Sequence, residues 1–96
     1  MQRTALVTGA TAGFGAAICR TLIENGYRVI GTGRRVARLE QLQQELGENF
    51  HFLAFDISDR QATEDAFHSL PATWQSIDLL VNNAGLALGL ESADKA

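Results

Sequence analysis

Three glycines near the N-terminus are spaced for phosphate binding. They lie in TGATAGFG, residues 8–15, between an apolar run and a segment with helical spacing. Gly9 lets the chain turn off a strand, Gly13 removes a Cβ where backbone would approach a pyrophosphate, and Gly15 lets a helix pack close to the sheet. Free N–H groups and the helix dipole then favour a phosphate. The predicted lining residues are Gly9, Thr11, Ala12, Gly13, Phe14 and Gly15.

This loop has two alternative interpretations. The glycines could simply make a strand-to-helix turn. The context favours phosphate binding, because they follow an apolar run, open a helical segment and begin a β-α-β pattern. A P-loop does not fit, since no Gly-Lys-Ser/Thr is present and the only lysine is Lys95.

Two arginines follow the second apolar run, where a dinucleotide site commonly has an acid. In VIGTGRR, residues 29–35, the run ends in Arg34 and Arg35. An acid there would bond a ribose 2′-hydroxyl and repel a 2′-phosphate, whereas guanidinium groups pair with phosphate. Two solvated arginines at a helix start are the alternative, which is disfavoured because cations are mildly unfavourable at a helix N-terminus. The pair therefore predicts NADP rather than NAD.

The elements that would position these residues alternate along the chain. The strands are expected to be apolar throughout, as in a parallel sheet that is covered on both faces. Right-handed crossovers leave few topologies. The spatial order 3-2-1-4 would be the first four strands of a doubly wound Rossmann sheet, an α/β fold, with the fourth strand as an apolar edge. Strands are predicted at 4–8, 27–32, 50–55 and 77–81, and helices at 13–25, at 35–46 and from a cap at Ser58 or Asp59 to 69.

Together these motifs resemble the classical short-chain dehydrogenase/reductase family. The resemblance covers essentially all of residues 1–96. The runs LVTGATAGFG and LVNNAGLALG look most like those of bacterial NADP-dependent members that act on 3-hydroxy acids, serine and allo-threonine. The motifs that carry the resemblance are TGATAGFG, the GRR after the second strand, the FDISD after the third and the NNAG at 82–85.

The resemblance implies further cofactor contacts at the ends of the third and fourth strands. Asp56 would accept from the adenine amino group, and the backbone N–H of Ile57 would also contact the ring. Asn83 would lie beside the cofactor, next to Ala84, and Gly85 would give the cofactor room. The alternatives are a turn or N-cap acid at Asp56 and an ordinary turn after the fourth strand.

The same family carries out hydride transfer with a Ser, a Tyr and a Lys four residues after that Tyr. Here Gly31 stands four residues after the only tyrosine, Tyr27, and Glu91 stands four residues before Lys95. Residues 1–96 therefore correspond to the N-terminal cofactor-binding part of one Rossmann domain, without the catalytic part. The full-length parent is expected to be an enzyme that transfers hydride between NADP and the CH–OH group of a small hydroxy acid. This chain alone is expected to be inactive.

Two other functions remain as alternatives. A non-catalytic NADP-binding sensor module would share the cofactor motifs. A Rossmann methyltransferase is less favoured, because such enzymes need a ribose-binding acid after the second strand, where this chain has Arg34 and Arg35.

Six of the eight basic residues lie in the N-terminal half, at or before Arg38, and this asymmetry fits an anionic ligand bound by that half. Net charge is −3, which gives no general attraction to nucleic acid or anionic membranes. The lone Cys19 excludes an internal disulfide framework, and His51 and His68 lack metal-ligand spacing.

No signal peptide or long apolar run is seen, so a cytoplasmic location is expected. The family resemblance implies a homo-oligomer, commonly a tetramer. The arginines expected to be solvated are Arg3, Arg20 and Arg28.

Overall fold

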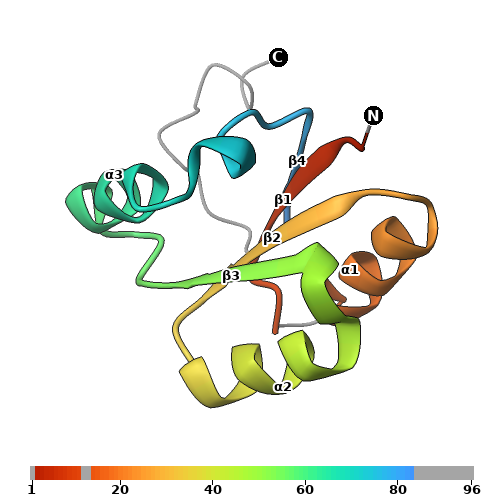
Figure 1. The fold of residues 1–96 in the computed structure, drawn as a ribbon. Coiled ribbons are helices and arrows are strands. Elements are labelled where there is room, and N and C mark those ends of the chain that lie inside the picture. Colours follow the sequence, from red (N-terminus) through yellow and green to blue (C-terminus); the bar gives the residue numbers. More distant parts are fainter. Residues whose placement is uncertain (1, 12–13, 84–96) are drawn as a thin grey trace.

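Four parallel strands form one sheet with helices on both faces. The computed structural model describes residues 2–11 and 14–83. The spatial order is β3-β2-β1-β4, which confirms the predicted 3-2-1-4 arrangement. Figure 1 shows the strands side by side, with α1 and α2 beneath the sheet and α3 to the left. The strands are β1 (Thr4–Thr8), β2 (Arg28–Gly33), β3 (Phe50–Ala54) and β4 (Leu79–Asn82).

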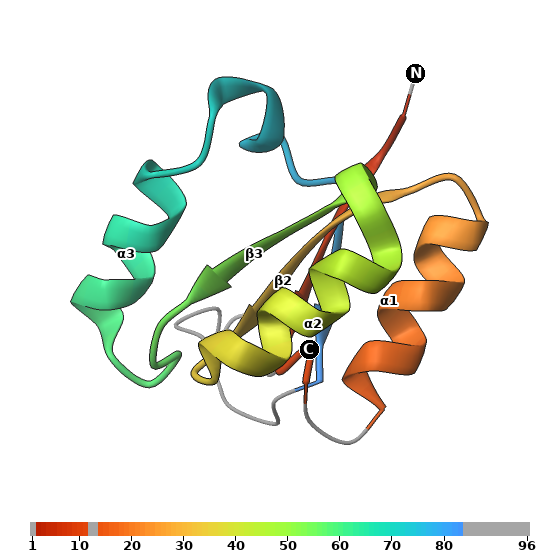
Figure 2. The ribbon, with the colours of Figure 1, turned by 60° about the horizontal axis from the view of Figure 1, so that its bottom comes forward.

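The helices divide between the two faces of the sheet. The helices α1 (Gly15–Glu24) and α2 (Val36–Leu46) cover one face, as the rotated view in Figure 2 also shows. The helix α3 (Arg60–His68) and the short helix η2 (Ala72–Trp74) lie against the other. A single turn, η1 (Gly47–Asn49), connects α2 to β3. None of the helices in the described ranges is long and apolar enough to cross a membrane.

The strands β1, β2 and β3 bury side chains on both faces, which explains why they are apolar throughout. Toward α1 and α2 the core contains Val7 and Val29, which pack with Leu39 and Phe50. Toward α3 and η2 it contains Leu6, Ile30, Leu53 and Leu70. Neighbouring residues of one strand thus point into different cores, as expected for a covered parallel sheet.

Cys19 belongs to the core beneath the sheet and is fully buried. Burial raises the pKa of its thiol to about 12, although Arg20 acts slightly in the opposite direction. The thiol is therefore protonated at neutral pH and fills space in the core, as the sequence predicts for a structural cysteine.

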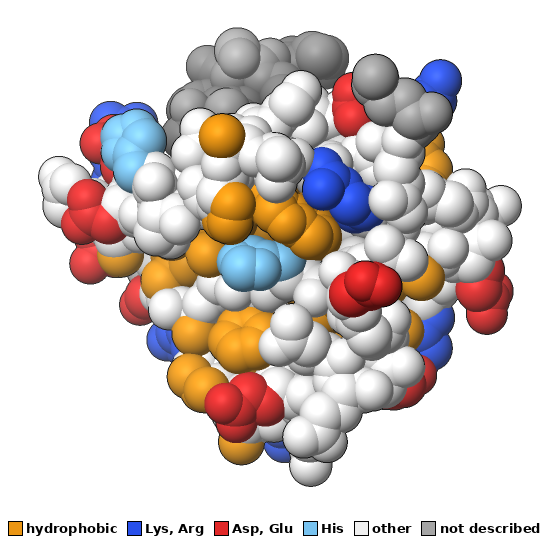
Figure 3. All heavy atoms as spheres, viewed as in Figure 1, with side chains coloured by type: hydrophobic (Ala, Val, Ile, Leu, Met, Phe, Trp, Pro, Cys, Tyr) orange, Lys and Arg blue, Asp and Glu red, His pale blue; other side chains and the backbone are white. Residues whose placement is uncertain are grey.

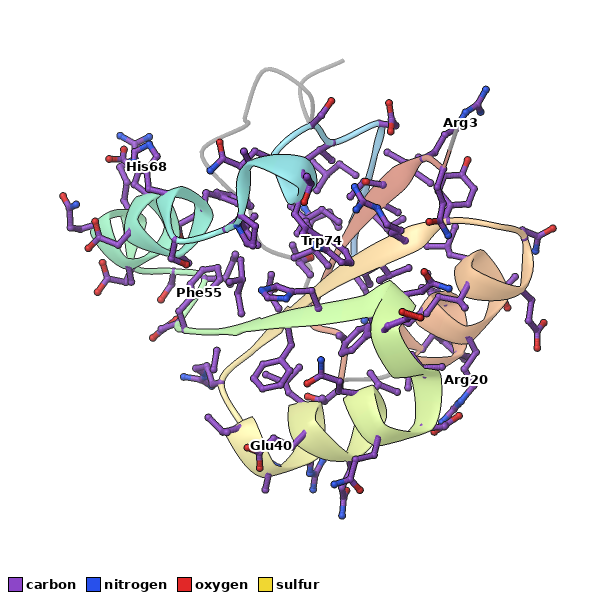
Figure 4. All side chains as sticks on the ribbon, in the orientation of Figure 1. Arg3, Arg20, Glu40, Phe55, His68 and Trp74 are labelled. Atoms are coloured by element: carbon purple, nitrogen blue, oxygen red, sulfur yellow. The ribbon has the colours of Figure 1, made fainter. Side chains whose placement is uncertain are left out.

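The expectation that Arg28 is solvated is wrong. Its guanidinium lies 4.4 Å from the centroid of the Trp74 ring and donates to Thr4 Oγ1 at 3.0 Å and to the Thr73 carbonyl. His51 approaches the same ring, with 5.3 Å between the two centroids. Figure 3 shows apolar side chains gathered around a histidine on this face, and Figure 4 shows Trp74 over the sheet. These contacts fasten η2 onto the amino ends of the strands.

The strand β4 forms the apolar edge that the sequence predicts. It pairs with β1 from Ala5↔Leu79 to Thr8↔Asn82. Leu79 and Leu80 each remain 37% exposed, which is unusual for leucines of a sheet that is otherwise well covered. The strand lies at 79–82 rather than the predicted 77–81: the Asp78 backbone N–H donates to Thr4 O at 2.8 Å, and strand pairing begins one residue later, at Leu79.

Candidate cofactor site

The glycine loop turns sharply at the carboxyl end of β1. Gly9 has φ 63°, which side chains rarely allow, so this position confirms the need for glycine. Ala10 N–H then donates to Thr32 O of β2 at 2.9 Å. The loop is therefore tied to the neighbouring strand immediately after the turn.

Gly15 is required by a close approach, although the neighbour differs from the predicted one. A Cβ at this position would lie 2.1 Å from Gly9 O and 2.8 Å from Ala10 C and O. Those atoms belong to the loop backbone, whereas the prediction had the helix approaching the sheet. The start of α1 is thus pressed against the turn that leaves β1, which directs the helix N-terminus at the loop.

The end of β4 holds the other side of the loop. Asn83 Nδ2 donates to Gly9 O at 3.0 Å, and Thr8 Oγ1 donates to Asn82 Oδ1 at 3.1 Å. Thr8 is fully buried at the end of β1, and its hydroxyl links this strand end, from which the loop departs, to the end of β4. The predicted adjacency of the glycine loop and the NNAG segment is confirmed for Asn82 and Asn83.

The two arginines stand at the carboxyl end of β2, beside the glycine loop. Arg34 and Arg35 are both exposed, and the Arg34 side chain is 74% exposed. Thr11 lies on the loop side of this end, because its Oγ1 is 3.6 Å from where a Cβ on Gly33 would stand. Because both side chains are exposed, a ligand phosphate can reach the guanidinium groups directly from solvent.

Asp56 follows β3 and faces Arg34 from the next strand end. Its Oδ2 lies 3.8 Å from Arg34 Nη1. Its Oδ1 accepts from Ser58 Oγ at 2.7 Å and from Ser58 N at 3.0 Å. The Ser58 hydroxyl, then the Ser58 N–H, and Arg34 more weakly, lower the pKa of the Asp56 carboxyl, so it is ionised at neutral pH.

Ser58 is the site residue whose role sequence reasoning missed. Ser58 and Asp59 are equal candidates for the helix cap in the sequence. Asp59 takes that role, because its Oδ1 accepts from Ala62 N at 3.0 Å. Ser58 is left to hydrogen-bond Asp56. An Asp two residues before a Ser is a recognisable turn pattern, so the spacing of Asp56 and Ser58 could have indicated this contact.

For two of the remaining predicted residues, Phe14 and Ile57, the structure gives the position in the chain and the exposure. Phe14 lies immediately before α1 with its side chain 78% exposed, and Ile57 is half-buried between Asp56 and Ser58. The other four lie outside the described residues: Ala12, Gly13, Ala84 and Gly85.

The described ranges contain no group of three or more side chains that could hold a metal ion. The polar side chains at the strand ends include two exposed arginines, the carboxylate of Asp56 and the amides of Asn82 and Asn83. Such a set suits a phosphate-containing organic ligand.

Comparison with known families gives a match to the sequence pattern of short chain dehydrogenases over residues 3–95. The chain belongs to this family. The glycine loop, the strand order and the polar strand ends described above are thus those of a short chain dehydrogenase.

Several relatives of this short chain dehydrogenase sequence are NADP-dependent by name. A Haemophilus influenzae protein named "Probable NADP-dependent dehydrogenase" is 69% identical over 93 residues, 97% of this chain and 37% of the relative. The Salmonella typhi "NADP-dependent 3-hydroxy acid dehydrogenase YdfG" is 60% identical over 91 residues, 95% of this chain and 37% of the relative.

A solved structure of the same family gives a similar fold. The closed form of serine dehydrogenase complexed with NADP+ has a TM-score of 0.82 and 55% identity, covering 88% of this chain and 34% of that one. The chain therefore spans little more than a third of the length of the relatives that it matches.

Proposed function

We propose that this chain is the NADP(H)-binding part of a short-chain oxidoreductase. The observation that carries the proposal is the position of Arg34 and Arg35, exposed at the end of β2 beside the glycine loop at the end of β1. A dinucleotide whose pyrophosphate lies on that loop places its adenosine ribose next to the end of β2. Guanidinium groups there favour a ribose that carries a 2′-phosphate. The NADP-dependent relatives support the same cofactor.

The residues present fit this cofactor. The Gly15 position leaves no room for a Cβ, so the helix start and the loop backbone lie close together, as pyrophosphate binding requires. Asp56 and Ile57 are proposed to hold the adenine, and Asn83 is proposed to lie beside the cofactor while it anchors Gly9. The nicotinamide supplies the hydride acceptor or donor. The proposed pyrophosphate loop is Gly9, Thr11, Ala12, Gly13, Phe14 and Gly15, and Ala84 and Gly85 complete the side near Asn83.

The whole protein is proposed to act on the CH–OH group of a small hydroxy acid, or on the corresponding carbonyl compound. This rests on relatives named as 3-hydroxy acid and serine dehydrogenases. A cytoplasmic homo-oligomer, such as a tetramer, is part of the same proposal.

Titration of the full-length protein with three cofactors tests the assignment. We expect NADPH to bind at least about tenfold more tightly than NADH, since a charge-assisted phosphate contact adds about 1.5–3 kcal/mol. S-adenosylmethionine should not bind at matched concentrations. Dissociation constants from calorimetry would decide. Equal affinities for NADPH and NADH would contradict the NADP assignment, and tight binding of S-adenosylmethionine alone would favour a methyltransferase.

Residues 1–96 alone are expected to be catalytically inert. Tyr27 is at the amino end of the sheet, immediately before β2, whereas the proposed cofactor contacts lie at the carboxyl ends. Purified chain should therefore give no NADP reduction above background with a 3-hydroxy acid or serine, followed by absorbance of the reduced nicotinamide. The full-length protein serves as the positive control. Turnover by residues 1–96 would overturn this prediction, and a full-length protein that binds NADPH without turning over any hydroxy acid would favour a sensor module.

A further inference from the structure

The turn between β3 and α3 connects Ser58 to Arg34 through one carboxylate. Asp56 Oδ1 accepts two hydrogen bonds from Ser58, at 2.7 Å from the hydroxyl and 3.0 Å from the N–H. With that oxygen fixed, Oδ2 faces Arg34 Nη1 at 3.8 Å. The two oxygens of one carboxylate thus have separate partners on two neighbouring strand ends.

We infer that Ser58 is a positioning residue that acts through Asp56 on Arg34 and thereby contributes to the selection of NADPH over NADH. This inference rests on the proposed function and adds a residue to the specificity of that same site. Ser58 itself need not touch the cofactor.

The physical argument begins with the freedom of Arg34. A long side chain that is 74% exposed samples many rotamers, and its ordering opposes phosphate binding. Asp56 is the one carboxylate within 4 Å of this guanidinium among the residues that the structure describes. It can bias the guanidinium toward the β3 side only if the carboxylate itself is fixed, and the Ser58 hydroxyl and N–H fix it together.

The weakness of the ion pair suits this role. Exposed ion pairs contribute little to stability, so Arg34 can leave Asp56 for a 2′-phosphate at small cost. In Ser58→Ala the Asp56 carboxylate keeps the hydrogen bond from the backbone N–H and loses the one from the hydroxyl, so its orientation is less restricted. It then either closes on Arg34 and competes with the phosphate, or turns away and leaves Arg34 unrestrained. Both results weaken the binding of NADPH through its 2′-phosphate, which NADH lacks, whereas any loss at the adenine is common to both cofactors.

The test compares NADPH and NADH dissociation constants for four variants of the full-length protein: Ser58→Ala, Ser58→Thr, Arg34→Ala and the double variant Ser58→Ala/Arg34→Ala. We expect Ser58→Ala to weaken NADPH about three- to tenfold more than NADH, as for loss of one hydrogen bond, since any change at the adenine affects both cofactors alike. Ser58→Thr keeps the hydroxyl and should restore the NADPH to NADH ratio. In the Arg34→Ala background, loss of Ser58 should not change that ratio further.

Asp59→Ala is the matched control, because it removes the true cap of the same helix. It should lower the Tm and leave the NADPH to NADH ratio unchanged. The inference is overturned if Ser58→Ala leaves the NADPH to NADH ratio unchanged, or changes that ratio as much without Arg34 as with it. Those outcomes leave the proposed function intact, which fails instead if the unaltered protein does not prefer NADPH.

Discussion

Replacing Arg34 and Arg35 together with alanine is expected to weaken NADPH binding about 100-fold or more and NADH binding less than threefold. Each guanidinium can donate charge-assisted hydrogen bonds to a phosphate, and hydrogen bonds to charged groups contribute about 1.5–3 kcal/mol each. Two such contacts therefore correspond to at least about two orders of magnitude in the dissociation constant. NADH lacks the 2′-phosphate, so it loses only a long-range attraction that salt screens.

Ionic strength and net charge must be held constant in this comparison. At about 0.1 M salt the screening length is about 10 Å, so distant arginines contribute little. The control is the double variant Arg3→Ala/Arg20→Ala, which removes the same charge from two other exposed positions. It should leave both dissociation constants within about twofold of the unaltered protein, because screened charges act weakly at a distance. Similar losses for both cofactors in the Arg34/Arg35 variant would overturn the role of these two residues in cofactor choice.

The order and type of the main elements could be predicted because local rules agree with the fold. Gly26 and Gly47 end helices with φ values of 89° and 79°, as their positions after apolar periodic segments indicate. The strands are short and apolar, and they alternate with helices, which restricts the topology to very few arrangements. Local pattern and tertiary packing lead to the same result in this chain.

Contacts between distant segments could not be predicted in the same way. Arg28 and Trp74 are 46 positions apart, and no periodicity indicates that the guanidinium stacks on the indole. The assignment of Asp59 rather than Ser58 as the cap of α3 likewise depends on the backbone geometry of one turn. Sequence patterns identify which types of residue gather at the strand ends, but the individual partners depend on how those ends are packed together.

For the candidate site, the sequence predicts which segments lie together wherever the order of the parallel strands brings their carboxyl ends to one edge of the sheet. Parallel strands place their carboxyl ends together, so Thr8 and Asn82 pair directly, and Gly33 pairs with Ala54. This register accounts for the adjacency of the glycine loop, Arg34, Asp56 and Asn83. The hydrogen bonds within that group, from Asn83 to Gly9 and from Ser58 to Asp56, depend on side-chain rotamers and required the structure.

Gly15→Ala is expected to destabilise the full-length protein and to weaken both cofactors. The added Cβ would stand 2.1 Å from Gly9 O, and the contacted atoms are backbone that cannot rotate away. Accommodating it requires α1 to move from the loop, at a cost of about 3 kcal/mol or more for a severe clash. The Tm should fall by about 5–10 °C, and binding of NADPH and NADH should weaken equally, because both carry the pyrophosphate.

Gly33→Ala is the matched control for this prediction. A Cβ there meets Leu39 Cδ1, Leu39 Cδ2 and Thr11 Oγ1 at 3.6 Å each, which is ordinary van der Waals contact, and its φ is not positive. Its Tm should change by no more than about 3 °C, since a compatible Gly→Ala change alters stability by less than about 1 kcal/mol. A Gly15→Ala protein that matched Gly33→Ala in both Tm and cofactor affinity would contradict the close approach of α1 to the loop. A loss confined to NADPH would contradict the assignment of the loop to the pyrophosphate, because only the 2′-phosphate distinguishes the two cofactors.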